Sequence, residues 1–109
     1  MFSQLAQDLA VTEPTTQFSA AVALSQDNSV RFSVTIINLG TSSGLNTTLQ
    51  GSNDLGFWES IGSALARTTI GTSSQESKNI TFAYVRLMYA TQGAGTTCII
   101  SANLNSSVQ

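Results

Sequence analysis

The stretch Gly51-Ser52-Asn53-Asp54-Leu55-Gly56-Phe57-Trp58 decides the fold of this chain. Apolar and polar residues alternate up to it, glycines bracket a Ser-Asn-Asp-Leu segment, and the only tryptophan follows at once. Alternation with a period of two predicts a strand, and the glycine-bracketed polar segment predicts a tight turn. A large aromatic residue next to the turn favours a return strand. We therefore predict an antiparallel hairpin and interpret Asp54 and Trp58 as its structural anchors.

The same period of two recurs along most of the chain. Val30, Phe32, Val34 and Ile36 alternate with polar residues and give the clearest strand. The other predicted strand segments are residues 16–24, 45–51, 58–65, 67–70, 80–90 and 96–104, and Gly62 is a candidate bulge. Residues 39–44 and the polar segment 71–78 are predicted loops. Seven or eight strands with turn signals between them predict an all-β protein, a single antiparallel β-sandwich or jelly roll over residues 16–109.

Residues 1–15 read as an N-terminal arm of this domain. Leu5 and Leu9 are four residues apart, which allows one or two helical turns over residues 3–10, and Pro14 ends any helix. The segment is short for a stable isolated helix, so an extended conformation is the alternative. We expect the arm to be ordered against its own sheet or against a neighbouring subunit, with Leu5, Leu9 and Val11 as candidate interface residues.

Composition excludes several partners. Charged residues make up 9% of the chain, against about 25% in ordinary soluble proteins, and the net charge is −2. The 4 basic residues are scattered, whereas nucleic-acid binding needs clustered lysine and arginine. No apolar run approaches the roughly 20 residues that span a bilayer, and no secretory signal is visible. We expect one domain, made in a cytoplasm, that binds neither nucleic acid nor membrane.

The residues that most enzymes and metal sites need are missing. The chain has no histidine and a single cysteine, Cys98, which removes Ser-His-Asp and Cys-His catalysis and a structural zinc site. Cys98 lies in an apolar run and is predicted to be a buried thiol. Asp54 and Glu59 flank one turn, a place where carboxylates are usually solvated. We therefore predict no enzyme activity, no cofactor and no metal.

Arg86 lies within the apolar strand segment 80–90, where an unpaired charge is costly. If Val85, Leu87 and Tyr89 face the core, Arg86 points outward. It then meets solvent, a subunit contact, or a carboxylate of Asp54 or Glu59 beside Trp58. We keep Arg86 as a candidate interface residue.

Three segments together resemble a known class of proteins. They are Leu49-Gln50-Gly51-Ser52-Asn53-Asp54, then Trp58 with Ile61-Gly62, and later Ala83-Tyr84-Val85-Arg86-Leu87. This pattern resembles the small β-sandwich structural proteins of tailed bacteriophages, in particular capsid cement or decoration proteins, over roughly residues 16–104. The resemblance implies a homotrimer that binds the outside of a phage head and bridges copies of the major capsid protein. It would be synthesised in the cytoplasm of the host bacterium and reside in the virion.

Two other functions stay open. The same segments are similar to discoidin-type carbohydrate- and lipid-binding sandwiches, so a carbohydrate-binding module is an alternative, with Phe57 and Trp58 as platforms for sugar rings. The other alternative is a tail or baseplate component of the same virion.

Overall fold

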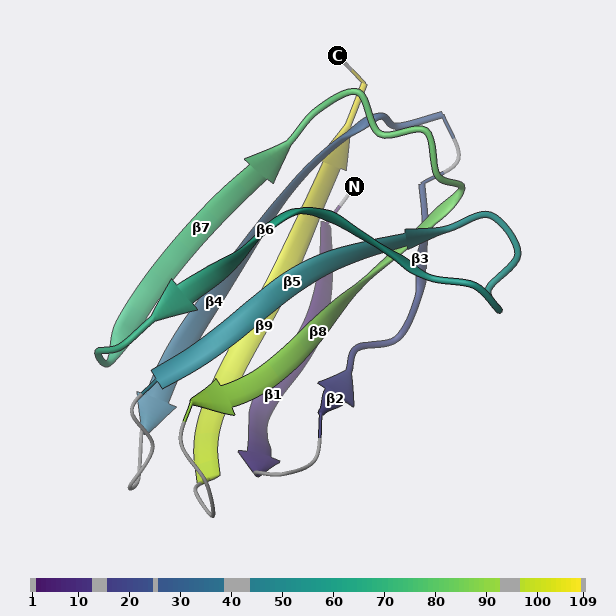
Figure 1. Ribbon diagram of the computed structural model, residues 1–109. Helices are drawn as coiled ribbons and strands as arrows, with labels where there is room; N and C mark the ends of the chain where they lie inside the picture. The colour runs from purple at the N-terminus through teal and green to yellow at the C-terminus, as the bar shows by residue number, and fades with distance from the viewer. Residues whose placement is uncertain (1, 13–15, 25, 39–43, 93–96, 109) are drawn as a thin grey trace.

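The computed structural model describes residues 2–12, 16–24, 26–38, 44–92 and 97–108 (Figure 1). Strands make up most of these residues. The nine strands are β1 (Phe2–Thr12), β2 (Gln17–Phe18), β3 (Val22–Ala23), β4 (Ser29–Asn38), β5 (Gly44–Ser52), β6 (Glu59–Arg67), β7 (Gly71–Ser77), β8 (Tyr84–Gln92) and β9 (Thr97–Ser107).

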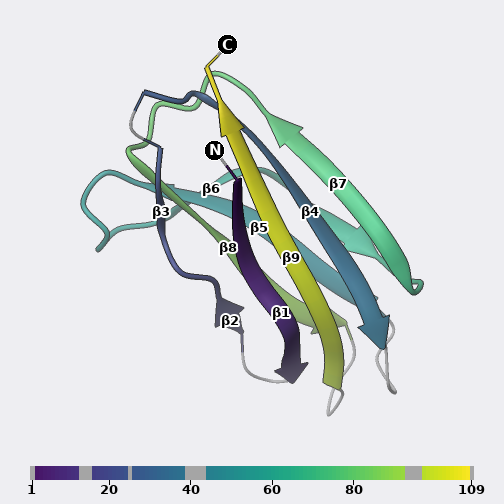
Figure 2. The ribbon, with the colours of Figure 1, turned by 180° about the vertical axis from the view of Figure 1, so that it is seen from behind.

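The strands form two antiparallel sheets, ordered β1-β9-β4-β7 and β2-β8-β5-β6, with β3 also paired to β8. Pairing is nested, because β1 pairs with β9, β2 and β3 with β8, β4 with β7, and β5 with β6. The chain is thus one long hairpin, rolled so that β4 also pairs with β9 and β5 with β8. Such nesting is the connectivity of a jelly roll. The two layers are seen from either side in Figures 1 and 2, and within the described residues no helix is long and apolar enough to cross a bilayer.

The hairpin predicted from the opening stretch is present and is the innermost pair of this roll. β5 and β6 are in register from Gly51↔Glu59 outward, and the turn between them covers residues 53–58. Beyond Leu49↔Ile61 the register shifts, because β6 carries extra residues opposite β5. Gly62 lies at this irregularity with a φ of 70°, a left-handed conformation that glycine adopts without strain. The predicted bulge is therefore confirmed.

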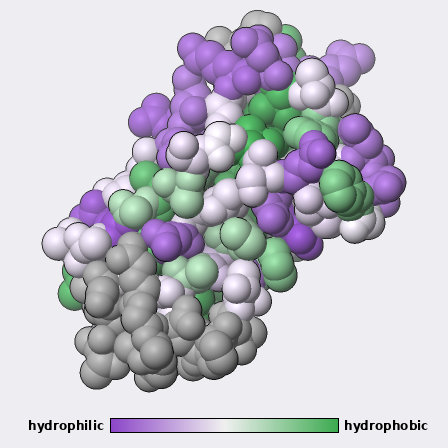
Figure 3. Space-filling model, viewed as in Figure 1, coloured by the Kyte–Doolittle hydropathy of each residue, from purple (hydrophilic) through white to green (hydrophobic). Residues whose placement is uncertain are grey.

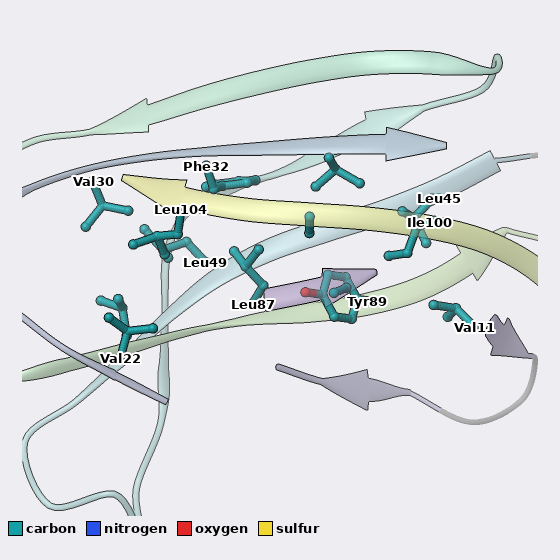
Figure 4. Close-up of a cluster of buried hydrophobic side chains, with 14 of the residues drawn as sticks. Val11, Val22, Val30, Phe32, Leu45, Leu49, Leu87, Tyr89, Ile100 and Leu104 are labelled. Carbon is teal, nitrogen blue, oxygen red and sulfur yellow. The ribbon is translucent and has the colours of Figure 1, made fainter. Parts of the chain in front are cut away.

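The core lies between the two sheets and is built mainly from inward-facing residues of β1, β4, β5, β8 and β9 (Figure 4). Exposure on β4 shows the alternation: Val30, Phe32 and Ile36 are fully buried, and Arg31 between them is exposed. Cys98 is also fully buried, as predicted. The other fully buried large side chains are Val11, Leu24, Leu45, Leu49, Val85, Leu87, Tyr89, Ile100 and Leu104. Each such side chain stabilises the fold by about 1.5–3 kcal/mol relative to an exposed one.

Residues 2–12 are an edge strand of the sandwich. β1 pairs with β9 from Phe2↔Asn105 to Thr12↔Thr97, with shifts of register between Gln4 and Leu9. The extended conformation predicted for the arm is therefore present, and the helical alternative over residues 3–10 is wrong. Pairing with β9 satisfies backbone groups along one edge of β1, whereas a short helix would bury only one narrow apolar stripe. Residues 13–15, including the predicted helix-ending Pro14, lie outside the described residues.

The apolar side chains of β1 pack into the protein's own core. Val11 is fully buried and Ala6 is 8% exposed, while Leu5 and Leu9 are partly buried against the same cluster. While β1 is paired with β9, Val11 presents no surface to a partner, so its role as an interface residue stays a prediction that requires β1 to move. Leu5 and Leu9 keep only part of their surface for a neighbour.

Residues 71–77 correct another expectation, because the predicted polar loop is the edge strand β7. Its partner is β4, in register from Val30↔Ser77 to Ile36↔Gly71. Hydroxyl groups join the two strands: Ser33 and Ser74 Oγ atoms are 2.8 Å apart, as are the Oγ1 atoms of Thr35 and Thr72. Without apolar alternation the segment gave no strand signal, yet hydroxyl pairs across strands stabilise pairing. Residues 39–43 of the other predicted loop lie outside the described residues, and Gly44 is the first residue of β5.

The strand predicted over residues 16–24 is split in two, which raises the strand number above the prediction. β2 and β3 flank residues 19–21, and both pair with β8. Phe18 is opposite Met88 and Val22 is opposite Val85, so the three residues 19–21 face only two residues of β8. An odd difference of this kind moves side chains to the opposite face. Val22 is consequently buried, while Phe18 is 48% exposed on the outer face.

Candidate binding surfaces

The turn of the central hairpin is held by side-chain hydrogen bonds to its backbone. Ser52 Oγ accepts hydrogen bonds from the N–H groups of Asp54 (3.2 Å) and Leu55 (2.9 Å). Asp54 Oδ1 accepts hydrogen bonds from the N–H groups of Gly56 and Phe57, each at 2.9 Å, and from Ser52 Oγ at 3.1 Å. Aspartate and serine commonly fix turns in this way. Asp54 therefore has the geometry of the structural anchor that the sequence predicts.

Electrostatics of the turn follow from these bonds. The backbone N–H of Phe57, and next that of Gly56, lower the pKa of Asp54 below its usual value, because they stabilise the carboxylate form. Asp54 therefore stays ionised throughout the physiological range and forms no ion pair within the described residues.

The turn presents apolar side chains to solvent. Leu55 is 50% exposed and Phe57 is 67% exposed. Leu55 also has a φ of 65°, a backbone conformation that is uncommon for a residue other than glycine. A cavity of about 270 Å³ opens beside Phe57, and its lining residues are Asn53, Asp54, Phe57, Glu59 and Phe82. We call the exposed Leu55 and Phe57 together with this cavity the hairpin tip.

A second cluster lies on the outer face of the β8 sheet. The Arg86 guanidinium carbon is 4.0 Å from the ring centroid of Phe18 and 4.2 Å from that of Trp58. Phe18 comes from β2, on one side of β8, and Trp58 precedes β6 on the other side. Arg86 Nε donates a hydrogen bond of 2.9 Å to Gln50 Oε1. We call these four residues the Arg86 cluster.

Trp58 is therefore not a core residue. Its side chain is only partly buried, it stands apart from the core cluster, and its Nε1–H donates a 3.2 Å hydrogen bond to the carbonyl of Leu55. Trp58 fixes the hairpin by joining the turn to Arg86. Phe57 lines the cavity instead, so the pair does not form one platform for sugar rings.

Arg86 lies where one of its predicted positions placed it, outward and beside Trp58, but its neighbours are aromatic rings rather than a carboxylate. Partial burial lowers its pKa. Among the described residues, Lys78 and Glu76 form the one ion pair, at 3.6 Å, so Arg86 pairs with neither Asp54 nor Glu59.

Arg67, at the end of β6, has a structural role. Arg67 Nε donates to the carbonyl of Thr69 at 2.8 Å, and its Nη atoms donate to the carbonyls of Ile70 and Thr72 and to Ser73 Oγ. These bonds close the β6–β7 turn. Over the described part of the chain, no three residues of the types that hold metals gather at one place.

Burial also prevents the phenol of Tyr89 from acting as an acid or a base. Tyr89 is fully buried, and burial raises its pKa. The side chain therefore stays protonated in the folded protein, where it packs in the core (Figure 4).

Comparison with solved structures shows which proteins share this fold. The chain is similar to part of a chain in the structure of infectious bursal disease virus, Gx strain, with a TM-score of 0.66 and 11% identity over 99% of this chain. It spans about a third, 31%, of that viral chain. It is also similar to the SPBc2 prophage-derived protein YomS, with a TM-score of 0.52 and 8% identity over 96% of this chain and 92% of YomS.

Carbohydrate-binding proteins share the same architecture. A CBM4 structure matches with a TM-score of 0.63 and 12% identity over 97% of this chain and 70% of that one. A CBM22-1 xylan-binding domain from Paenibacillus barcinonensis Xyn10C matches with a TM-score of 0.54 and 8% identity, over 99% of this chain and 86% of the domain. At these identities the likeness establishes the β-sandwich fold alone. No protein-family model and no curated protein matches the chain.

Sequence reasoning missed three residues of these surfaces. The outward position of Phe18 was not predicted, because the alternation over 16–24 gave no sign of the register change at residues 19–21. Gln50 and Phe82 carried no signal of their own. The outward position of Gln50 follows from the buried Leu49, and its register with Arg86 could have been found only from strand pairing.

Proposed function

We propose that this chain is a structural protein of a phage virion, a capsid cement or decoration subunit that binds the outside of the head and contacts the major capsid protein. It acts by binding, not as an enzyme, and assembles as a homotrimer. The observation that carries the proposal is the hairpin tip, where a turn fixed by Ser52 and Asp54 holds Leu55 and Phe57 exposed beside a cavity. Pre-ordered apolar side chains around a pocket are the features of a protein docking site.

Two further observations support this proposal. The segments around residues 49–62 and 83–87 resemble phage decoration proteins, and chains of the same fold occur in a virus structure and in a prophage-derived protein. The low charge of the chain, 9% charged residues and a net charge of −2, keeps repulsion between neighbouring copies small on a crowded shell.

Co-sedimentation with phage heads tests this role. Heads of the phage that encodes the chain, prepared without it, are mixed with the wild type or with a Leu55→Ser/Phe57→Ser variant. Ile70→Ser is the matched control, because Ile70 is 62% exposed at the opposite end of β6. We expect the wild type and the control to sediment with heads and the double variant to stay in solution. If the wild type stays in solution, the decoration role is overturned. If the double variant sediments with heads, the docking site is overturned.

Oligomeric state is tested separately by light scattering at several protein concentrations. A trimer predicts a mass of about three times the 11.4 kDa of one chain. A monomer at every concentration overturns the homotrimer.

A second candidate function is carbohydrate binding, and the Arg86 cluster favours it. Phe18 and Trp58 place two aromatic rings on one open sheet face, and Gln50 adds an amide beside them. Aromatic faces with a few polar groups are typical of sugar sites. A glycan array with the wild type and with a Phe18→Ala variant tests it, and a wild type that binds no glycan contradicts it.

A further inference from the structure

The Arg86 guanidinium is held in place by its neighbours, but its two Nη atoms have no hydrogen-bond partner within the described segments. The two rings lie 4.0 and 4.2 Å from its central carbon, and Gln50 takes the Nε–H. Gln50 is itself held, since its Nε2 lies 3.7 Å from Met88 Sδ. No hydrogen bond joins either Nη atom of Arg86 to another of the described residues. The cluster thus fixes a planar pair of donors without using them.

Among the described residues, no carboxylate forms an ion pair with Arg86. Neither of the two carboxylates nearest in sequence to Trp58 pairs with Arg86: Asp54 Oδ1 accepts three hydrogen bonds within the turn, and Glu59 lines the cavity beside Phe82. Partial burial lowers the pKa of Arg86, which means that its positive charge is less well solvated than in water. An external anion would stabilise this charge in place of the lost water.

The shape of the free donors selects the anion. A guanidinium presents its N–H groups in a rigid fork that matches a carboxylate in bidentate geometry, and aromatic rings on its faces leave the edge as the route of approach. A carboxylate arriving at that edge forms two parallel charge-assisted hydrogen bonds.

The surroundings of the fork suit a sugar rather than a general polyanion. Phe18 remains 48% exposed beside the guanidinium and can stack against the C–H face of a sugar ring. Ser60, in register with Gln50, is exposed on the neighbouring strand and offers a hydroxyl. Figure 3 shows this side of the molecule as mixed hydrophilic and hydrophobic residues. Because the net charge is −2, the chain has no long-range attraction for polyanions, so an anion must be recognised locally.

We propose that the Arg86 cluster is a binding site for a uronic acid residue of an acidic polysaccharide, with the sugar carboxylate on the Nη atoms of Arg86 and the ring against Phe18. This inference rests on the carbohydrate-binding candidate above and adds to it the charge of the ligand. It is independent of the hairpin tip.

Trp58 fluorescence tests the site directly, because the only tryptophan of the chain is part of it. The full-length protein is titrated with a galacturonic acid tetramer and, as the matched neutral ligand, with the methyl ester of the same tetramer. We expect the acid to change the fluorescence saturably and the ester to bind at least about tenfold more weakly, the effect of losing charge-assisted hydrogen bonds. Arg86→Gln and Arg86→Lys should each weaken binding of the acid about tenfold or more, because lysine cannot form the bidentate contact.

Arg31→Gln is the control variant. It removes the same charge from an exposed position on the other sheet and should change the affinity less than about twofold. Far-ultraviolet circular dichroism of each variant establishes that it is folded, and nuclear magnetic resonance shifts of the Phe18 ring locate the ligand independently of Trp58.

Each contrary result has its own meaning. Equal binding of acid and ester overturns the carboxylate site and leaves the carbohydrate-binding candidate intact. Failure of both sugars to bind overturns the inference. If neutral glycans on the array also fail, the carbohydrate-binding candidate falls with it. Poly-L-glutamate that binds with the same dependence on Arg86 while the sugar acid does not bind assigns the fork to an acidic protein partner and overturns the sugar.

Discussion

Val11 on β1 lies in register with Cys98 on β9, and both side chains are fully buried. The first and last strands of the described chain therefore share one core. An N-terminal segment that could detach to reach a neighbour would have to pull Val11 out of it.

Deletion of residues 1–12 is accordingly expected to abolish cooperative unfolding, because it strips the edge of β9 and opens the core. Val11→Ala should lower the free energy of unfolding by about 2 kcal/mol through lost burial and a small cavity. Gln7→Ala, at an exposed position of the same strand, should change it by less than about 0.5 kcal/mol. Urea unfolding measures all three, and a truncated chain that unfolds like the wild type would show that β1 is dispensable.

Trp58→Ala should destabilise the protein by only about 1–2 kcal/mol, since the ring loses a cation–π contact and partial burial but leaves no core cavity. Phe32→Ala, at a fully buried position, should cost about 3–5 kcal/mol. The comparison is made by urea unfolding, followed by circular dichroism. Equal losses of unfolding free energy in the two variants would show that the Trp58 ring is packed like a core residue.

Gly51→Ala should destabilise the hairpin by about 1–3 kcal/mol, because an added methyl group would overlap the Phe82 ring and approach Ile61 Cδ1 to 2.9 Å. Gly56→Ala is the matched control, since its nearest neighbour there would be Asp54 Oδ1 at 3.7 Å. Thermal unfolding of both variants gives the result. A stable Gly51→Ala protein would mean that Phe82 moves away at little cost.

Asp54 makes stability depend on pH. Because its pKa in the folded protein is lowered from the usual 3.8, the carboxylate stabilises the folded state fully above that value, and the contribution is lost as pH falls through the folded-state pKa. Asp54→Asn should therefore be less stable than the wild type at neutral pH and should lose less stability below pH 3.8. Glu59→Gln removes one negative charge from the other end of the same turn and serves as the control for net charge. Parallel pH curves for Asp54→Asn and the wild type would contradict the assignment.

The sequence predicts well the elements whose signals are local. The 53–58 turn and the β4 strand follow from alternation and turn residues, and the structure has both. Elements that depend on a partner were harder to predict. β7 has no apolar alternation and becomes a strand through its register with β4, while β1 looks weakly helical until β9 pairs with it.

The same distinction explains the candidate surfaces. Asp54 could be predicted as a turn anchor because its partners are two and three residues away. The Arg86 cluster joins residues from four separate segments of the chain, and the outward position of Phe18 depends on the register change between β2 and β3. Spacing along the chain carries no information on such contacts.

Nested pairing has a consequence for how the molecule reaches its folded state. Only β5 and β6 can pair across a short turn, and each further pair closes a longer loop at a higher entropic cost. Folding is therefore expected to begin at residues 53–58 and to proceed outward, with the slow rates of topologies dominated by distant contacts. Because β9 lies between β1 and β4, neither strand has its full set of backbone partners until β9 has left the ribosome. Until then the emerging chain exposes unpaired strands, so its yield in the cell should depend on protection from aggregation during synthesis.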